Sequence, residues 1–279
     1  MDLSQKITNV VHSGGNMSTQ IIIVFSLNFI ISIIGTLAYS VRLVGVRTGK
    51  IAMSYALFNV LMLVSRVAVT FQAPILTKYV EKNVGSSQLL NIFFATIIVS
   101  GVASVFGAFL VPTFQKLLSK GVMAFSVQRS IPKLLIHSFS KTGINHFKSF
   151  VAIPVKTNLV MADFKKLPKK TIILNMIAVA ILTSGALSPI YAGSLEPGLR
   201  ATCITLSSII NGIASIMMAV FIDPQLSVMT DDVIEGKCSE KEFRACVIGM
   251  VGSKTIGTFL ALLLFLPASY LIVFVARFI

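Results

Sequence analysis

Long apolar runs separated by shorter polar segments dominate the chain. A bilayer crossing takes about 20 mostly apolar residues, and six runs are long enough. Apolar residues fill these runs instead of alternating or recurring every three to four positions, unlike the one-sided elements of a soluble core. The runs lie near 20–41, 51–73, 89–111, 172–192, 199–222 and 247–276. We therefore predict an all-α, polytopic membrane protein with about six transmembrane helices, forming a single transmembrane domain over residues 1–279.

Prolines lie beside five of the twelve predicted span ends. Because proline lacks the N–H that a helix interior needs, we interpret prolines beside the apolar runs as helix terminators. They are Pro74, Pro112, Pro189 and Pro197, and Asp223-Pro224 closes the fifth span. The last run is longer than a bilayer requires and contains Pro267, which predicts a tilt, a kink or an interfacial turn. The first run is too long for the apolar region of a signal peptide, so we expect it to be retained.

The distribution of basic residues predicts the orientation. Of the 279 residues, 55% are hydrophobic and 12% charged, and the formal net charge is +14. Such a charge on a soluble protein would suggest nucleic acid, but no RNP-like or zinc-finger pattern supports that partner. The segments 42–50, 112–171 and 223–244 hold 17 Lys and Arg, against 5 on the opposite side. Since Lys and Arg beside spans stay in the cytoplasm, we predict that both termini are extracytoplasmic.

Two of these segments differ in character. The basic cytoplasmic loop, 112–171, is too long to be structureless and mixes apolar with basic residues around 133–137 and 147–153, which predicts interfacial amphipathic helices. It serves either as a topology-setting anchor or as a cytoplasmic gate that attracts anionic membrane lipids. The segment 223–244 is an acidic cytoplasmic loop, and its carboxylates have little influence on orientation.

No catalytic, metal or nucleotide motif is complete. Gly45 to Lys50 and Gly249 to Thr255 approach a phosphate-binding loop, but each lacks a required residue. Ser138 to Gly143 holds overlapping S-x-x-K and K-T-G elements, which are separate in the enzymes that use them. The cysteines form no C-x-x-C pair, and the histidines have no carboxylate partner at helical spacing. We expect no catalytic residue, no metal and no cofactor.

Charges inside the spans are the sharper functional candidates, because a charge in hydrocarbon is costly. Arg66 lies fifteen residues into the second span, roughly 22 Å along a helix at 1.5 Å per residue. It either lines a polar cavity or extends its side chain to the outer interface. Lys254 either faces the interior or marks the cytoplasmic end of the last span. The small residues Gly107 and Gly257, each four positions after another small residue, predict close helix contacts.

Four stretches resemble the Amj family of bacterial lipid II flippases, the alternate to MurJ. They are Thr36 to Thr48, Val64 to Arg66 with Gln72 to Pro74, Phe221 to Gln225, and Met229 to Gly236. The resemblance covers essentially the full length in size and number of spans. Many members are expected to carry an acidic residue where this chain has Gly35, so a carboxylate role at that position does not transfer.

The resemblance implies transport of lipid II, the undecaprenyl-pyrophosphate-linked peptidoglycan precursor, from the inner to the outer leaflet of the bacterial cytoplasmic membrane. A pyrophosphate needs cationic hosts, which makes Arg42, Arg47, Arg66 and Lys254 candidate substrate-binding residues. Candidates for ion-pair or gating roles are Asp223, Asp231, Asp232, Tyr39 and Gln72. The alternatives from the residues alone are a membrane-embedded polyprenyl-lipid transferase or phosphatase, a small-ion or solute transporter, and a non-transporting partner of the cell-wall machinery.

Overall fold

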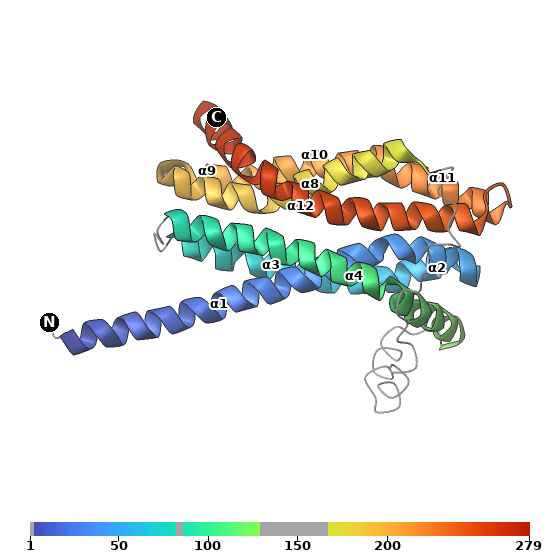
Figure 1. Cartoon of the computed structure of the whole chain (residues 1–279), viewed down its shortest axis with the longest axis horizontal. Helices are drawn as coiled ribbons and strands as arrows, with labels where there is room; N and C mark the ends of the chain where they lie inside the picture. The colour runs from blue at the N-terminus through green and yellow to red at the C-terminus, as the bar shows by residue number, and fades with distance from the viewer. Residues whose placement is uncertain (1–2, 82–85, 129–166) are drawn as a thin grey trace.

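The computed structural model describes residues 3–81, 86–128 and 167–279, and regular structure in these ranges is helical throughout (Figure 1). The elements, in chain order, are α1 (Leu3–Leu37), η1 (Ala38–Ser40), α2 (Val41–Thr48), α3 (Ile51–Glu81), α4 (Ser86–Gln128), α8 (Lys169–Leu195), η2 (Pro197–Leu199), α9 (Arg200–Thr205), α10 (Ser207–Met217), η3 (Met218–Ile222), α11 (Asp223–Ile234) and α12 (Glu240–Phe278). Within them, 6 helical stretches are long and apolar enough to cross a membrane, which confirms the predicted fold class. The interfacial helices expected around 133–153 lie outside the described residues.

Several helices are longer than predicted, because the terminator reading of three prolines was wrong. Pro74, Pro112 and Pro189 lie inside α3, α4 and α8. In hydrocarbon every backbone group needs an internal partner, so continuing the helix past a proline sacrifices fewer hydrogen bonds than unwinding it. Pro267 likewise lies within α12, which bends in its C-terminal part (Figure 1).

The segment after Asp223 also differs from the prediction of a loop. The fifth span passes through the π-helical turn η3 directly into α11, so residues 223–234 are helical. Pro224 lies in the first turn of α11, where its missing N–H costs little. The fifth span therefore extends as helix into the segment that carries the acidic residues.

The bundle consists of two halves with three long helical stretches each. The N-terminal half comprises α1 to α4, and the C-terminal half comprises α8 to α12. In each half, a glycine on the third helical stretch allows that stretch to pack closely against the first stretch. A Cβ on Gly107 of α4 would lie 3.0 Å from Cβ of Thr36, and one on Gly257 of α12 would lie 2.4 Å from the carbonyl oxygen of Met176. These contacts confirm the close helix packing that the small-residue spacing predicted.

The two ends of the bundle differ in what they carry (Figure 1). One end, here called the α2 end, holds α2, α11 and the first turns of α12; the opposite end holds both chain termini. Gly49 ends α2 with a left-handed φ of 65°, and its N–H is bonded to the carbonyl oxygens of Gly45 and Val46. This tight reversal into α3 fixes α2, with its two arginines, at the α2 end.

Apolar and aromatic side chains join the two halves toward the opposite end. Phe93 of α4 packs against Tyr191 of α8 and Phe265 of α12, with ring centroids 5.8 Å and 5.6 Å away, and Tyr191 and Phe265 are 5.3 Å apart. Phe94 lies 5.6 Å from Phe265. We call these four residues the aromatic cluster. They belong to a buried core that draws on α1, α3, α4, α8 and α12, so it closes the interface at this end.

Candidate functional site

Arg42 of α2 is bound to the C-terminal half at the α2 end. Its Nη1 donates to Ser227 Oγ at 2.8 Å, and its Nη2 lies 3.3 Å from Asp223 Oδ1, both on α11. Its guanidinium carbon also lies 5.5 Å from the centroid of the Tyr55 ring. The sequence indicated Asp223 as a candidate for an ion pair, and the structure pairs it with Arg42.

Arg47, one and a half turns further along α2, reaches a second carboxylate of the C-terminal half. Its Nε and Nη2 both lie 2.8 Å from Glu240 Oε1, at the start of α12. Its Nη1 donates to Gln115 Oε1 of α4 at 3.2 Å. Glu240 Oε1 also accepts from Nη2 of Arg244, one turn along α12, at 3.1 Å. Both arginines of α2 are therefore neutralised across the interface between the halves.

A buried hydrogen-bond chain continues inward from α2. The hydroxyl of Tyr39 in η1 donates to Asn175 Oδ1 of α8 at 2.8 Å, and Asn175 Nδ2 donates to Ser253 Oγ of α12 at 2.8 Å. Asn175 is 1% exposed, so all its polar atoms depend on these partners. The chain joins the N-terminal half to two helices of the C-terminal half.

Lys254 lies next along α12, fourteen residues from the helix start, roughly 21 Å at 1.5 Å per residue. The structure therefore places it deep in the bundle and not at the end of the helix. Its Nζ donates to the carbonyl oxygen of Ser32 on α1 at 3.2 Å and to Ser104 Oγ on α4 at 3.0 Å. No carboxylate among the described residues forms an ion pair with it. A Cβ on Gly35 would lie 3.2 Å from Lys254 Cε, so the glycine leaves room for the lysine.

The other predicted site residues are not brought to this interface. Arg66 lies midway along α3 with an exposed side chain that forms no ion pair within the described part of the chain. Gln72 is 7% exposed, on the inward face of α3. Asp231 is exposed and Asp232 half-buried near the end of α11, and neither forms a salt bridge to another described residue. The carboxylate that does reach Arg47 is Glu240.

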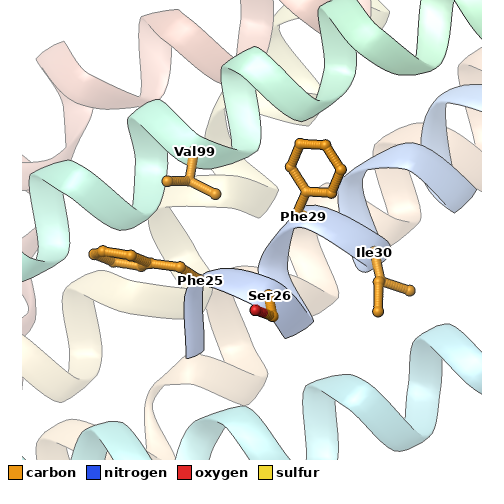
Figure 2. A pocket seen from close by; sticks show the side chains of 5 residues that line it. All are labelled: Phe25, Ser26, Phe29, Ile30 and Val99. Carbon is orange, nitrogen blue, oxygen red and sulfur yellow. The ribbon is translucent and has the colours of Figure 1, made fainter. Parts of the chain in front are cut away.

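A shallow apolar depression lies on the surface between α1 and α4 (Figure 2). Its volume is about 430 Å³, and it is lined by Phe25, Ser26, Phe29, Ile30 and Val99. The lining has no charge, so it suits hydrocarbon better than a polar headgroup. Among the residues that the structure describes, no group of three or more His, Cys, Asp and Glu side chains is placed to hold a metal ion.

Comparisons with known proteins point to one family. The model of the family described as "Amj: Alternate to MurJ" matches residues 27–276. The chain is 34% identical, over 265 residues, to the protein named "Lipid II flippase Amj" of Bacillus subtilis (strain 168), covering 94% of this chain and 98% of that one. No solved structure matches.

Proposed function

We propose, because this chain belongs to the Amj (alternate to MurJ) family, that it is a lipid II flippase. Its substrate would be the undecaprenyl-pyrophosphate-linked precursor, carried from the inner to the outer leaflet of a bacterial cytoplasmic membrane. The observation that carries this proposal is the near full-length similarity to a protein of that name. The cations at the interface between the two halves supply the chemistry that a pyrophosphate requires.

The α2 end is the cytoplasmic end in this proposal. It holds Arg42 and Arg47 of α2 and, in the first turns of α12, Lys241 and Arg244, and basic residues beside spans favour the cytoplasmic side of a membrane. Both termini are then extracytoplasmic. Anionic lipids of the inner leaflet gather at the same end, where these basic residues attract them.

The substrate first meets Arg42 and Arg47 and then Lys254. Guanidinium groups offer bidentate hydrogen bonds to phosphate oxygens, whereas the Lys254 ammonium is a point charge deeper in the bundle. Lys254 has hydroxyl and carbonyl partners and no carboxylate among the described residues, which suits a site that receives its counter-charge from the substrate. Arg66 contributes a further cation on the exposed face of α3. The polyprenyl tail stays in the bilayer, against apolar surface such as the depression in Figure 2.

The membrane potential assists this direction of movement. Each negative charge that leaves an inside-negative cell releases about 2.3 kcal/mol per 100 mV. Transport on this basis needs no catalytic residue, and the proposed role is that of a transporter.

Two measurements on the full chain test the proposal. The first is rescue of a bacterium depleted of its lipid II flippases, together with a leaflet-resolved assay of lipid II. The second uses proteoliposomes that carry Arg42→Ala, Arg47→Ala, Arg66→Ala or Lys254→Met. We expect rescue by the wild type and reduced flipping by the variants, whereas Lys237→Ala, at an exposed pair with Glu235, should flip normally. Failure of the wild type to externalise lipid II would refute the function, and full activity of all four variants would refute the cationic path.

A further inference from the structure

The two arginines that we assign to the lipid headgroup are not free in this structure. Asp223 Oδ1 lies 3.3 Å from Nη2 of Arg42, and Glu240 Oε1 lies 2.8 Å from both Nε and Nη2 of Arg47. A carboxylate offers a guanidinium the same kind of negative acceptor oxygen as a phosphate does. The two carboxylates therefore hold the positions that an anionic headgroup would need.

The arginines are the more buried members of these pairs and the carboxylates the more exposed ones, and Glu240, when displaced from Arg47, keeps Arg244 of its own helix as a partner at 3.1 Å. The Arg42 side chain is 15% exposed and Arg47 31%, whereas Asp223 is 60% exposed and Glu240 44%. Arg42 is also held by Ser227 Oγ and the Tyr55 ring, and Arg47 by Gln115 Oε1. Exposed ion pairs contribute little to stability, so another anion can replace the carboxylate without unfolding the site.

Both pairs cross the interface between the halves. Arg42 and Arg47 belong to α2 of the N-terminal half, while Asp223 and Glu240 begin α11 and α12 of the C-terminal half. Within the described residues these are the only salt bridges between the halves. A ligand that binds the arginines in place of the carboxylates therefore breaks the ion pairs that hold α2 to the C-terminal half.

We propose that Asp223 and Glu240 occupy the place of the substrate's phosphates, and that the pyrophosphate of lipid II displaces them and thereby frees α2 from α11 and α12. This inference rests on the proposed function. It makes Asp223 and Glu240 specificity-determining residues, because only a ligand that outcompetes a carboxylate at Arg42 and Arg47 opens this end. Because a carboxylate and the substrate compete for the same guanidinium group, weakening the carboxylate contact raises the fraction of protein that is competent to bind and so strengthens substrate binding.

Binding of lipid II to the full chain in nanodiscs of uncharged lipid tests the exchange, with undecaprenyl pyrophosphate as a second probe that lacks the sugar and peptide. Asp223→Asn and Glu240→Gln should each bind both probes about two- to five-fold more tightly, the range expected when an exposed ion pair no longer competes. Asp231→Asn is the matched control, since it removes one carboxylate from an exposed position of α11 without breaking a tie between the halves. It should bind as the wild type does, whereas a general loss of negative charge would tighten binding in all three variants.

Arginine variants separate failure of the exchange from failure of the proposed function. If Arg42→Ala and Arg47→Ala bind lipid II more weakly while Asp223→Asn and Glu240→Gln show unchanged or weaker binding, the exchange is wrong and the proposed headgroup site stands. If both arginine variants bind as the wild type does, the headgroup site itself is wrong.

A distance measurement covers the case in which an amide variant does not fold. Spin labels at Lys50→Cys, after α2, and Lys237→Cys, after α11, are introduced into the otherwise wild-type chain with Cys238→Ser, because Cys203 and Cys246 are buried. The distance between the labels should lengthen when lipid II is added. A distance that stays unchanged at saturating lipid II would overturn the proposal.

Discussion

The two ends of the interface between the halves are held by different forces. At the α2 end, the described charged ties are Arg42 with Asp223 and Arg47 with Glu240. Toward the opposite end, the aromatic cluster packs side chains of both halves. Ion pairs exchange their partners with any competing anion, whereas apolar packing responds only to a change in shape. An anionic ligand can therefore act directly on one end and only indirectly on the other.

Between these ends lies a buried polar layer. It consists of the chain from Tyr39 through Asn175 to Ser253, and of Lys254 with its two acceptors in the N-terminal half. Leaving a buried polar group without a hydrogen-bond partner costs free energy. This layer therefore favours the relative position of the two halves in which these hydrogen bonds form. The interface thus passes from exchangeable charges, through fixed hydrogen bonds, to close apolar packing.

The largest effect is expected at the aromatic cluster. Phe265→Ala should lower the free energy of unfolding by about 3–5 kcal/mol, because it removes a side chain that is 0% exposed and touches three other rings. Denaturation of the purified protein in detergent measures the change. Leu263→Ala, at a position 73% exposed on the same helix, should leave the stability nearly unchanged. Equal losses in both variants would show that the cluster does not hold this end.

The polar layer should respond less strongly. Asn175→Ala removes the acceptor of the Tyr39 hydroxyl, while the Ser253 hydroxyl loses a donor and keeps its bond to the Met250 carbonyl oxygen. A buried group left without its partner costs about 1–3 kcal/mol. The same denaturation assay checks it, with Asn59→Ala on the exposed face of α3 as the control. If Asn175→Ala is as stable as Asn59→Ala, the layer does not fix the register of the halves.

Lys254→Met tests the polar layer with a substitution that should raise the stability and not lower it. Replacing a buried cation that has no described carboxylate partner by an apolar side chain of similar length should raise the stability by about 1 kcal/mol. Under the proposed function the same variant loses flipping, so stability and transport move in opposite directions. Denaturation and a leaflet assay on one preparation check both. A variant that is less stable would mean that the ammonium serves mainly to join the helices.

The number of spans was predictable from sequence because it depends only on the length of apolar runs, whereas helix ends depend on local hydrogen bonding. The start of α12 had a signal that was missed. Ser239 Oγ accepts from the N–H of Glu242 at 3.2 Å, and S-x-x-E is a common helix-start pattern. Reading that signal would have placed the last helix at Glu240 and not near residue 247.

The site was predictable in residue type but not in partners. Five asparagines lie in the apolar runs and look alike in sequence, yet only packing shows that Asn175 links three helices while Asn59 is exposed. Likewise the basic residues of α2 stand out, but their partners are more than 180 positions away along the chain. The choice of Glu240 over Asp231 or Asp232 depends on how α11 and α12 are placed relative to α2.

The smallest effect on stability is expected at the α2 end. Glu240→Gln should change the free energy of unfolding by less than about 1 kcal/mol, because the pair is 31% and 44% exposed and water screens it. A high salt concentration should weaken this ion pair and leave the aromatic packing unchanged, since the Debye length falls from about 10 Å at 0.1 M to about 3 Å at 1 M. Denaturation of the wild type and of Glu240→Gln should therefore converge in 1 M NaCl, while the loss caused by Phe265→Ala persists. If the loss in Glu240→Gln is large and insensitive to salt, the α2 end is held as rigidly as the aromatic cluster, and a phosphate could not displace its carboxylates.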